Sequence, residues 1–440
     1  FWHDPVTSLQ LSAQHLKFVE EKHKAVIMLS KYRYFANNIH LIAKSKPSPF
    51  YRAYSGRQPS KILPTCPQMI LRQTTSSAAT ESTLINNVAE IPLRAQRAVG
   101  KWLLTCAGMC FGAVALGGIT RLTESGLSMV DWHLIKGMKP PRTEEEWETY
   151  FKKYQQFPEY QYMKREMTLS DFKFIFYMEW FHRMWGRTVG LVFALPAIYF
   201  WRKGWLSKAM KPRVGILGGI LLFQGLMGWF MVKSGLEEKP GPNDVPRVSQ
   251  YRLAAHLGTA LVLYTGFMWS ALSHLMTPTQ LVQNLQVARL RKMAHLTKGM
   301  VFLTALSGAF VAGLDAGLVY NSWPKMADRW IPDDLFAHSP TWKNFFENPT
   351  AVQFNHRHLG EITGACVMGV WWMARKAPLP PRVRLAVNAL CGMALLQIAL
   401  GVTTLLTYVP TPVAATHQSG SLVLLSIAIW LTHELRRLPK

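Results

Sequence analysis

The sequence predicts an all-α, polytopic membrane protein in which eight transmembrane helices form two parallel-repeat four-helix bundles. Of the 440 residues, 49% are hydrophobic and only 17% are charged, whereas charged residues make up about 25% of soluble domains. The mean hydropathy is nevertheless only +0.06, so the apolar residues must be gathered into blocks separated by polar segments. In addition, motifs in the first half of the chain recur in the second.

Eight apolar stretches reach the length of about 18 residues that is needed to cross the hydrocarbon core of a bilayer. They occupy approximately residues 100–119, 173–201, 213–232, 252–276, 293–313, 353–374, 384–408 and 414–432. Each stretch is expected to form one transmembrane helix.

A basic arm, residues 1–95, precedes the first stretch. Up to Arg94 it holds twelve Lys or Arg against five acids, with many Ser and no apolar run long enough to span a membrane. This composition is typical of an organelle-import arm, and an ordinary basic disordered tail is the alternative. The rest of the chain divides into an N-terminal four-helix unit, 96–276, and a C-terminal four-helix unit, 277–440.

The positions of the charges predict the orientation of the helices. The formal net charge is +24, and much of the excess lies in the arm and in three short connections, 202–213, 289–292 and 375–384. This distribution indicates targeting and membrane orientation, and no nucleic acid partner is expected. The long connections, 120–171 and 314–352, are rich in Asp and Glu. The positive-inside rule then places both termini on one side and the long loops on the other.

The two halves share a repeat. Glu179-Trp-Phe-His-Arg aligns without a gap with Gln353-Phe-Asn-His-Arg, and the alignment continues through Gly190 and Gly364. Further matches pair Glu124-Ser-Gly-Leu and Trp132 with Asp315-Ala-Gly-Leu and Trp323, Gln224 and Gly228 with Gln397 and Gly401, and Ala255-His256 with Thr416-His417. Because each unit contains an even number of spans, the two copies have the same orientation in the membrane, which makes this a parallel repeat.

Four histidines occupy matched positions within the first three turns of the even-numbered spans. They form two candidate pairs, His182 with His256 and His356 with His417, because facing helices of a four-helix bundle build sites in its interior. A single His on an apolar helix is more often a satisfied buried polar group than a ligand. Four at matched places in a repeat indicate that they bind something in common.

The surroundings of these histidines favour haem. Small residues follow at helical spacing, such as Gly186 after His182 and Gly360 after His356, and a porphyrin plane needs a flat, open helix surface. A site with only imidazole ligands is also typical of haem. Three arginines near the histidines are candidate partners for haem propionates, with snorkelling to lipid headgroups as the alternative. They are Arg183, Arg252 and Arg357.

Glu179 distinguishes the two halves, because its counterpart is Gln353. A carboxylate inside a membrane span is costly, so it points to function by default. The structural alternative is an ion pair between Glu179 and Arg183 at helical i, i+4 spacing. The functional interpretation predicts that the first half does chemistry while the second only holds a cofactor.

These motifs resemble those of the heme A synthase family, in its mitochondrial form. The resemblance covers about residues 97–435 and includes Leu122-Thr-Glu-Ser-Gly-Leu. It implies an oxidoreductase of the mitochondrial inner membrane that oxidises the C8 methyl group of heme O to the formyl group of heme A, for use in cytochrome c oxidase. It also implies that His182 and His256 hold the substrate haem, and that Glu179 is the catalytic acid.

In the second half, the resemblance assigns a b-type cofactor haem to His356 and His417, with Arg357 beside it. An electron donor such as a ferredoxin is expected, and heme O synthase and cytochrome c oxidase assembly factors are candidate partners besides the lipid bilayer. The termini are expected on the matrix side and the haem-ligand end toward the intermembrane space. Many bacterial members carry a cysteine pair in the first outer loop, but here no Cys lies between Cys110 and Cys366. This excludes any mechanism that uses the pair.

Two successive hydroxylations of the methyl group would give a geminal diol, which loses water to form the aldehyde. Two routes to hydroxylation are consistent with the residues. In one, an axial ligand leaves and oxygen is activated at the iron; in the other, electrons are removed from the macrocycle and water captures the resulting cation. A bis-histidine cytochrome that only transfers electrons is the alternative function, and it has no need of an acid in one half alone. A transporter built from parallel repeats is a third reading, but matched breaks in the spans are missing; Pro196 stands alone.

Overall fold

The computed structural model describes residues 91–132, 139–237 and 246–436. All of them belong to one compact unit, Thr83–Lys440. The predicted targeting arm, 1–95, lies outside the described residues apart from its last five. Within the described part of the chain the secondary structure is helical, and the only β feature is an isolated bridge between Met326 and Arg329. The predicted all-α class is therefore confirmed.

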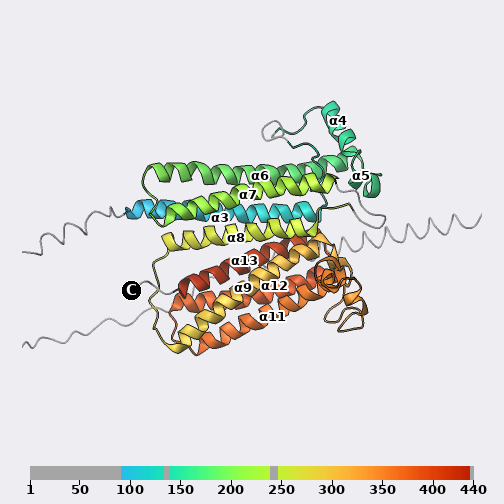
Figure 1. Cartoon of the computed structure of the whole chain (residues 1–440). Helices are drawn as coiled ribbons and strands as arrows, with labels where there is room; N and C mark the ends of the chain where they lie inside the picture. Colours follow the sequence, from blue (N-terminus) through green and yellow to red (C-terminus); the bar gives the residue numbers. More distant parts are fainter. Residues whose placement is uncertain (1–90, 133–138, 238–245, 437–440) are drawn as a thin grey trace, which may run out of the picture. The chain divides into compact units, whose positions relative to one another are not determined.

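Long helices account for most of the described residues (Figure 1). They are α3 (Leu93–Leu122), α6 (Leu169–Arg202), α7 (Met210–Glu237), α8 (Gln250–Leu275), α9 (Leu285–Gly313), α11 (Pro349–Arg375), α12 (Pro381–Leu406) and α13 (Thr411–Glu434). Five of them, α3, α7, α9, α12 and α13, are long and apolar enough to cross a membrane. Helices α6, α8 and α11 have the length but are more polar. The chain is thus a polytopic membrane protein.

The helices start earlier than the apolar stretches suggested, and this corrects one predicted connection. Residues 289–292 were expected to link two spans, but they lie inside α9, and the chain between α8 and α9 runs from 276 to 284. The Asn284 side chain caps α9 by accepting a hydrogen bond from the Val287 amide. Arg and Lys are good helix formers, so the cap rather than the end of hydrophobicity determines where this helix begins.

Both long connections lie at the same end of the helices (Figure 1). The first contains α4 (Glu144–Tyr154) and α5 (Pro158–Met163). The second contains η2 (Ala316–Leu318), η3 (Asp333–Phe336), η4 (Thr341–Lys343) and α10 (Asn344–Glu347). Trp147 of α4 is buried against Phe172 and Phe176 of α6, with ring centroids 6.4 and 5.1 Å away. The first connection is therefore fixed on the start of α6.

The two halves pack in the same pattern. In the first, α3 contacts α6 and α8, and α7 contacts the same two helices. In the second, α9 contacts α11 and α13, and α12 contacts the same two. Replacing each helix by its repeat partner converts one set of contacts into the other. Between the halves, α13 contacts α3 and α8, and α8 contacts α9.

Polar contacts tie the halves together along this boundary. Near the long loops, Asp315 accepts hydrogen bonds from Arg121, at 2.8 Å, and from Arg247, at 3.0 Å. Deeper in the bundle, the Gln418 amide donates to the backbone oxygen of Val114 over 2.9 Å. Three further pairs bridge the boundary: Tyr251 with Glu347, Tyr264 with Ser426, and Ser273 with His433.

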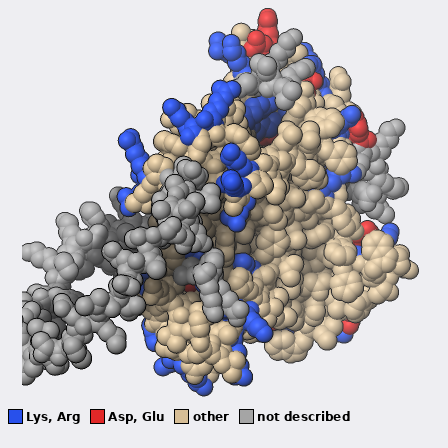
Figure 2. All heavy atoms as spheres, turned by 60° about the vertical axis from the view of Figure 1, so that its left-hand side comes forward, with Lys and Arg blue, Asp and Glu red and all other residues tan. Residues whose placement is uncertain are grey.

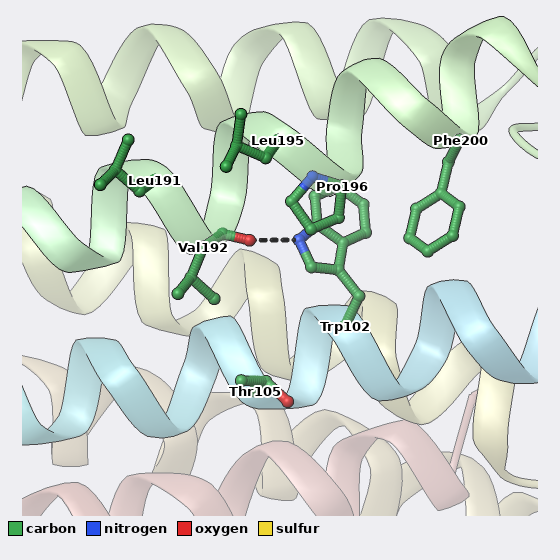
Figure 3. Close-up of a pocket in the computed structure, with 7 residues that line it drawn as sticks. All are labelled: Trp102, Thr105, Leu191, Val192, Leu195, Pro196 and Phe200. Carbon is green, nitrogen blue, oxygen red and sulfur yellow. Dashed lines mark hydrogen bonds between the residues drawn. The ribbon is translucent and has the colours of Figure 1, made fainter.

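Pro196 interrupts the backbone hydrogen bonds inside α6. Proline has no N–H, so the carbonyl four residues earlier loses its helical donor. That carbonyl belongs to Val192, and it accepts a hydrogen bond from the indole Nε1 of Trp102 on α3, 3.0 Å away (Figure 3). An apolar hollow of about 420 Å³ adjoins this contact and is lined by Leu191 and Leu195 among others. None of the four histidines lines it.

The surface has the character expected of a membrane protein. Much of the face seen in Figure 2 carries neither Lys and Arg nor Asp and Glu; basic side chains gather on the left of this view, and acidic ones lie mainly at the top and right. Large apolar side chains of the long helices are exposed, for example Leu195, Leu222 and Leu385, at 60 to 68%. Such exposure on long helices suits contact with lipid.

Candidate functional site

The four histidines lie near the end of the helices that carries the long connections. His256, His356 and His417 are in the second or third turn of α8, α11 and α13. His182 is in the fourth turn of α6, not within the first three, because α6 begins at Leu169. All four side chains are half-buried.

A glycine on a neighbouring helix faces each imidazole ring. A Cβ placed on Gly117 would lie 2.9 Å from Cε1 of His182, and one on Gly401 would lie 2.9 Å from Cε1 of His417. The same construction gives 3.6 Å for Gly228 and His256, and 3.5 Å for Gly308 and His356. The glycines thus leave room for the rings, and the first two positions have no space for a methyl group without movement.

His356 and His417 converge in the second half. Their ring centroids are 6.5 Å apart and their planes are perpendicular. A metal ion bound by two imidazole nitrogens at about 2.0–2.1 Å each would separate the ring centres by about 6 Å. The spacing of this pair therefore suits one metal ion held between the two rings.

His182 and His256 differ from the second pair in their hydrogen bonds. The Nδ1 atoms of both rings are buried and have no hydrogen-bond partner among the described residues. Buried polar atoms without partners are uncommon in native proteins and call for an explanation. In the second pair, the Ser307 hydroxyl lies beside Nδ1 of His356 and the Gln397 amide beside Nδ1 of His417, so the two pairs differ in what lies next to this nitrogen.

Glu179 is 2% exposed and is held by several donors. Its Oε1 lies 2.6 Å from Nη2 of Arg183, which makes the ion pair considered from the sequence. Its Oε2 accepts hydrogen bonds from the Ser128 hydroxyl and from the Met129 amide, both at 2.7 Å. A buried ion pair is tolerated where further hydrogen bonds satisfy the charges, and these bonds meet that condition. The result is a fixed negative charge one turn from His182.

Arg183 is also fixed, so it does not extend to lipid headgroups. It donates to the backbone oxygens of Met129, at 2.9 Å, and Asp131, at 3.3 Å. The indole ring of Trp132 lies 4.4 Å from its guanidinium carbon. The Arg183 Nε remains buried and without a partner among the described residues. Arg183 therefore anchors the first outer loop and still has one donor available.

The second half repeats this anchor without the acid. Arg357 donates to the backbone oxygen of Tyr320, the repeat partner of Met129, over 2.8 Å, and Gln353 donates to the same oxygen over 3.1 Å. Nε and Nη1 of Arg357 are buried and have no partner in the described part of the chain. The Nε–H and Nη1–H groups of Arg357 are thus two buried hydrogen-bond donors near His356.

The remaining candidate arginine, Arg252, lies on α8 one turn before His256. Its guanidinium carbon is 5.4 Å from the centre of the Phe230 ring. The structure therefore brings each candidate site residue to the same end of the bundle, with Glu179, His182 and Arg183 on α6 and Gln353, His356 and Arg357 on α11.

A second buried acid lies in the first outer loop. Glu159 accepts hydrogen bonds from the Tyr154 hydroxyl, at 3.0 Å, and from the Lys164 ammonium, at 3.1 Å. Burial raises the pKa of Glu159 above its ordinary value, although Lys164 opposes this effect. Lys164 also donates to the backbone oxygen of Glu124 over 2.7 Å, so this cluster holds the start of the loop.

Some contacts of the site were not foreseen from the sequence. Ser128 and Met129 bind Glu179, and Ser307 binds His356, yet none of the three belongs to a motif that indicates function. The repeat does contain a signal for the glycines, because the register that aligns Glu124 with Asp315 also aligns Gly117 with Gly308. The same register aligns Ser307 with Leu116.

Comparisons with known proteins agree with the motifs. A family model described as "Cytochrome oxidase assembly protein" (COX15-CtaA) matches residues 100–429. "Heme A synthase COX15" of Bos taurus is 63% identical over 346 residues, which cover 79% of this chain and 84% of that protein. The protein of the same name from Mus musculus is 60% identical, with 85% and 91% covered. That of Arabidopsis thaliana is 47% identical, with 78% and 76% covered.

Proposed function

The chain belongs to the COX15-CtaA family of cytochrome oxidase assembly proteins, and we propose that it acts as a mitochondrial heme A synthase whose chemistry takes place in its first half. It is an oxidoreductase that converts heme O to heme A for cytochrome c oxidase. The 63% identity to a heme A synthase over 346 residues supports the activity. The observation that supports placing the chemistry in the first half is the buried carboxylate of Glu179 where the second half has Gln353.

The architecture that we propose is a parallel repeat of two four-helix units, 96–276 and 277–440, with eight membrane spans. The equivalent packing of the two sets of helices supports it. So does the backbone before each outer loop, since Glu124 and Asp315 are repeat partners and both have a positive φ, of 49° and 51°. Non-glycine residues rarely adopt this conformation, so a shared occurrence is informative.

In the second half, His356 and His417 would hold a b-type haem through its iron, and the two buried donors of Arg357 would pair with its propionates. The separation of the two rings and the buried donors of Arg357 fit such a group. When bound, this haem supplies one-electron transfer. The two histidines would hold and orient such a group, and the Arg357 guanidinium would bind its carboxylates.

In the first half, His182 and His256 would bind the substrate, heme O, with Arg183 and Arg252 near its propionates. The carboxylate of Glu179 is held in place before the reaction, since Ser128, Met129 and Arg183 all bind it. Such a preorganised charge can stabilise positive charge that develops on the methyl carbon, or accept a proton from it. Two oxidations at that carbon would then give a geminal diol, and loss of water gives the formyl group of heme A.

The location that we propose is the mitochondrial inner membrane, with the arm 1–95 as the targeting region. Both termini and the basic short connections would lie on the matrix side, and the haem-ligand end would face the intermembrane space. The segregation of basic side chains supports this orientation. An electron donor such as a ferredoxin would supply or accept electrons, and heme O synthase and cytochrome c oxidase assembly factors are expected partners.

A bis-histidine cytochrome that only transfers electrons is the second candidate, because the His356–His417 pair alone would serve it. Expression in cells that lack heme A synthase, followed by extraction and chromatography of the haems, separates the two functions. We expect heme B in the purified protein together with heme O or heme A, and heme A in the cell membranes. Heme B alone, with no heme A formed, would favour the cytochrome.

A further inference from the structure

The hydrogen bonds of the imidazole Nδ1 atoms differ between the two halves. Ser307 of α9 lies with its hydroxyl oxygen 2.7 Å from Nδ1 of His356. The same hydroxyl donates its only hydrogen to the backbone oxygen of Thr304, 2.8 Å away. The serine oxygen must therefore accept the hydrogen of Nδ1, which leaves Nε2 of His356 as the nitrogen with a free lone pair.

This tautomer is the one that an iron ligand needs. Residues that accept a hydrogen bond from the second nitrogen of a metal-bound imidazole fix the orientation of the ring and increase its basicity. The position of Ser307 is itself fixed, since Thr304 is bound through its own hydroxyl to Thr363, 2.8 Å away. A series of hydrogen bonds from Thr363 of α11 through Thr304 and Ser307 of α9 thus fixes the orientation of the His356 ring.

The other histidine of the second half also has a neighbour at Nδ1. Nε2 of Gln397 lies 3.1 Å from Nδ1 of His417, but an amide nitrogen only donates hydrogen bonds, so Gln397 does not offer this ring the acceptor that Ser307 offers His356. In the first half, the repeat partner Gln224 donates to the backbone oxygen of His256, at 3.2 Å, as Gln397 does to that of His417, at 2.7 Å. The glutamines are thus alike in sequence, but only the second one reaches the imidazole ring.

The first half lacks an equivalent of Ser307. The repeat register places Leu116 at that position, and a leucine side chain cannot accept a hydrogen bond. Nδ1 of His182 and of His256 accordingly have no partner among the described residues. Among the described residues, the imidazoles of His182 and His256 therefore lie beside Gly117 and Gly228 with no hydrogen bond at Nδ1 to oppose rotation of the ring.

We propose that Ser307 is a positioning residue that makes His356 a permanent haem ligand, and that Leu116 leaves His182 free to release its haem. The inference rests on the proposed function, which needs one haem that stays and one that enters as substrate and leaves as product. The two halves would then differ in haem exchange because of one hydroxyl group, independently of Glu179. Loss of such a partner typically weakens metal binding by about 10–100-fold.

The test uses the full chain, purified with its haems, and measures the rate at which excess apomyoglobin removes heme B. We expect Ser307→Ala to lose heme B about 10–100-fold faster than the unmodified protein, and its heme B midpoint potential to become more positive because the ligand donates less charge. Ser307→Thr keeps the hydroxyl and should restore both values. Ser234→Ala is the matched control, since within the described part of the chain the Ser234 hydroxyl binds only backbone oxygens of its own helix.

The reciprocal variant, Leu116→Ser, supplies the missing acceptor and should slow the loss of heme O or heme A from the first half. Equal rates of heme B loss and equal potentials for Ser307→Ala and the unmodified protein would overturn the inference, whatever the heme A output. Failure of the unmodified protein to form heme A would overturn the proposed function instead. The rate of heme B loss and the midpoint potential thus test the role of Ser307, while heme A formation tests the proposed function.

Discussion

Glu179 and Gln353 occupy equivalent positions on α6 and α11, but only Glu179 forms an ion pair with the arginine one turn later. Glu179 lies 2.6 Å from Arg183, whereas Gln353 Oε1 lies 3.4 Å from Arg357. In both halves the arginine also binds a backbone oxygen of the outer loop, at Met129 or Tyr320. The loop can therefore be anchored without an acid, so anchoring alone does not account for Glu179.

We expect Glu179→Gln to fold, to keep its b-type haem and to lose most heme A formation. Glutamine has nearly the same size and can still bind Arg183, as Gln353 binds Arg357, but it carries no charge. Removal of one preorganised electrostatic group costs about 10²-fold or more in rate, so heme O or a hydroxylated intermediate should accumulate. Chromatography of extracted haems measures this. Gln353→Glu is the control and should leave heme A formation in place; normal output from Glu179→Gln would refute the catalytic role.

The two histidine pairs should affect different haems. His356→Ala or His417→Ala is expected to diminish the retained heme B, since each would remove one of the two proposed iron ligands. His182→Ala or His256→Ala should chiefly reduce heme O binding and heme A formation. Absorbance spectra and haem chromatography of the four purified variants distinguish these effects. An equal loss of heme B from all four would contradict separate roles for the pairs.

Gly117 and Gly228 allow a matched test of how tightly the first site fits. A methyl group at Gly117 would lie 2.9 Å from Cε1 of His182, closer than carbon atoms tolerate, while one at Gly228 would lie 3.6 Å from Cε1 of His256. We expect Gly117→Ala to displace His182 and to reduce heme O binding severalfold, and Gly228→Ala to be tolerated. The heme O content of the two purified variants gives the comparison. Equal haem contents would show that the ring position is not set by this glycine.

Trp102 should contribute to stability far from the histidines. Trp102→Phe removes the donor to the Val192 carbonyl, which lost its helical partner at Pro196, and an unsatisfied buried acceptor costs about 1–3 kcal/mol. We expect a lower Tm in detergent with unchanged heme A formation per folded molecule. Trp205→Phe is the control, because the Trp205 ring stacks on Phe200 with centroids 5.6 Å apart but makes no indole hydrogen bond among the described residues. Equal Tm values would show that the carbonyl finds another donor.

The sequence predicted the helices well because lipid imposes a strong constraint on length and hydrophobicity. It predicted their starts poorly: Asn284 begins α9 ahead of three basic residues, and Thr168 begins α6 with a capping box that includes Asp171. Caps are local hydrogen bonds between polar residues, and a search for apolar runs passes over them. Because α6 starts early, at Leu169, His182 lies in the fourth turn of the helix rather than within the first three turns.

The candidate site was predictable where the repeat provided a comparison. The four histidines stand out because each has a histidine as its repeat partner, and Glu179 stands out because its repeat partner is Gln353. The ligands of Glu179 were not predictable, since Ser128 and Met129 reach it from a loop through tertiary contacts. Arg183 and Arg357 were treated as candidates for propionates or headgroups, but both bind loop carbonyls as well. Only the folded chain reveals this shared anchoring.

The hydrogen bonds of Asp315 restrict how the two halves can move relative to one another. It belongs to the second half but binds Arg121 and Arg247 of the first, and Gln418 crosses in the opposite direction to Val114. Rocking of one repeat against the other, the motion used by many transporters, would stretch several of these contacts at once. These contacts between the halves therefore oppose movement of one half relative to the other. If the first half exchanges haem as we propose, the exchange would depend on movement of side chains and helices within that half rather than on movement of the second half.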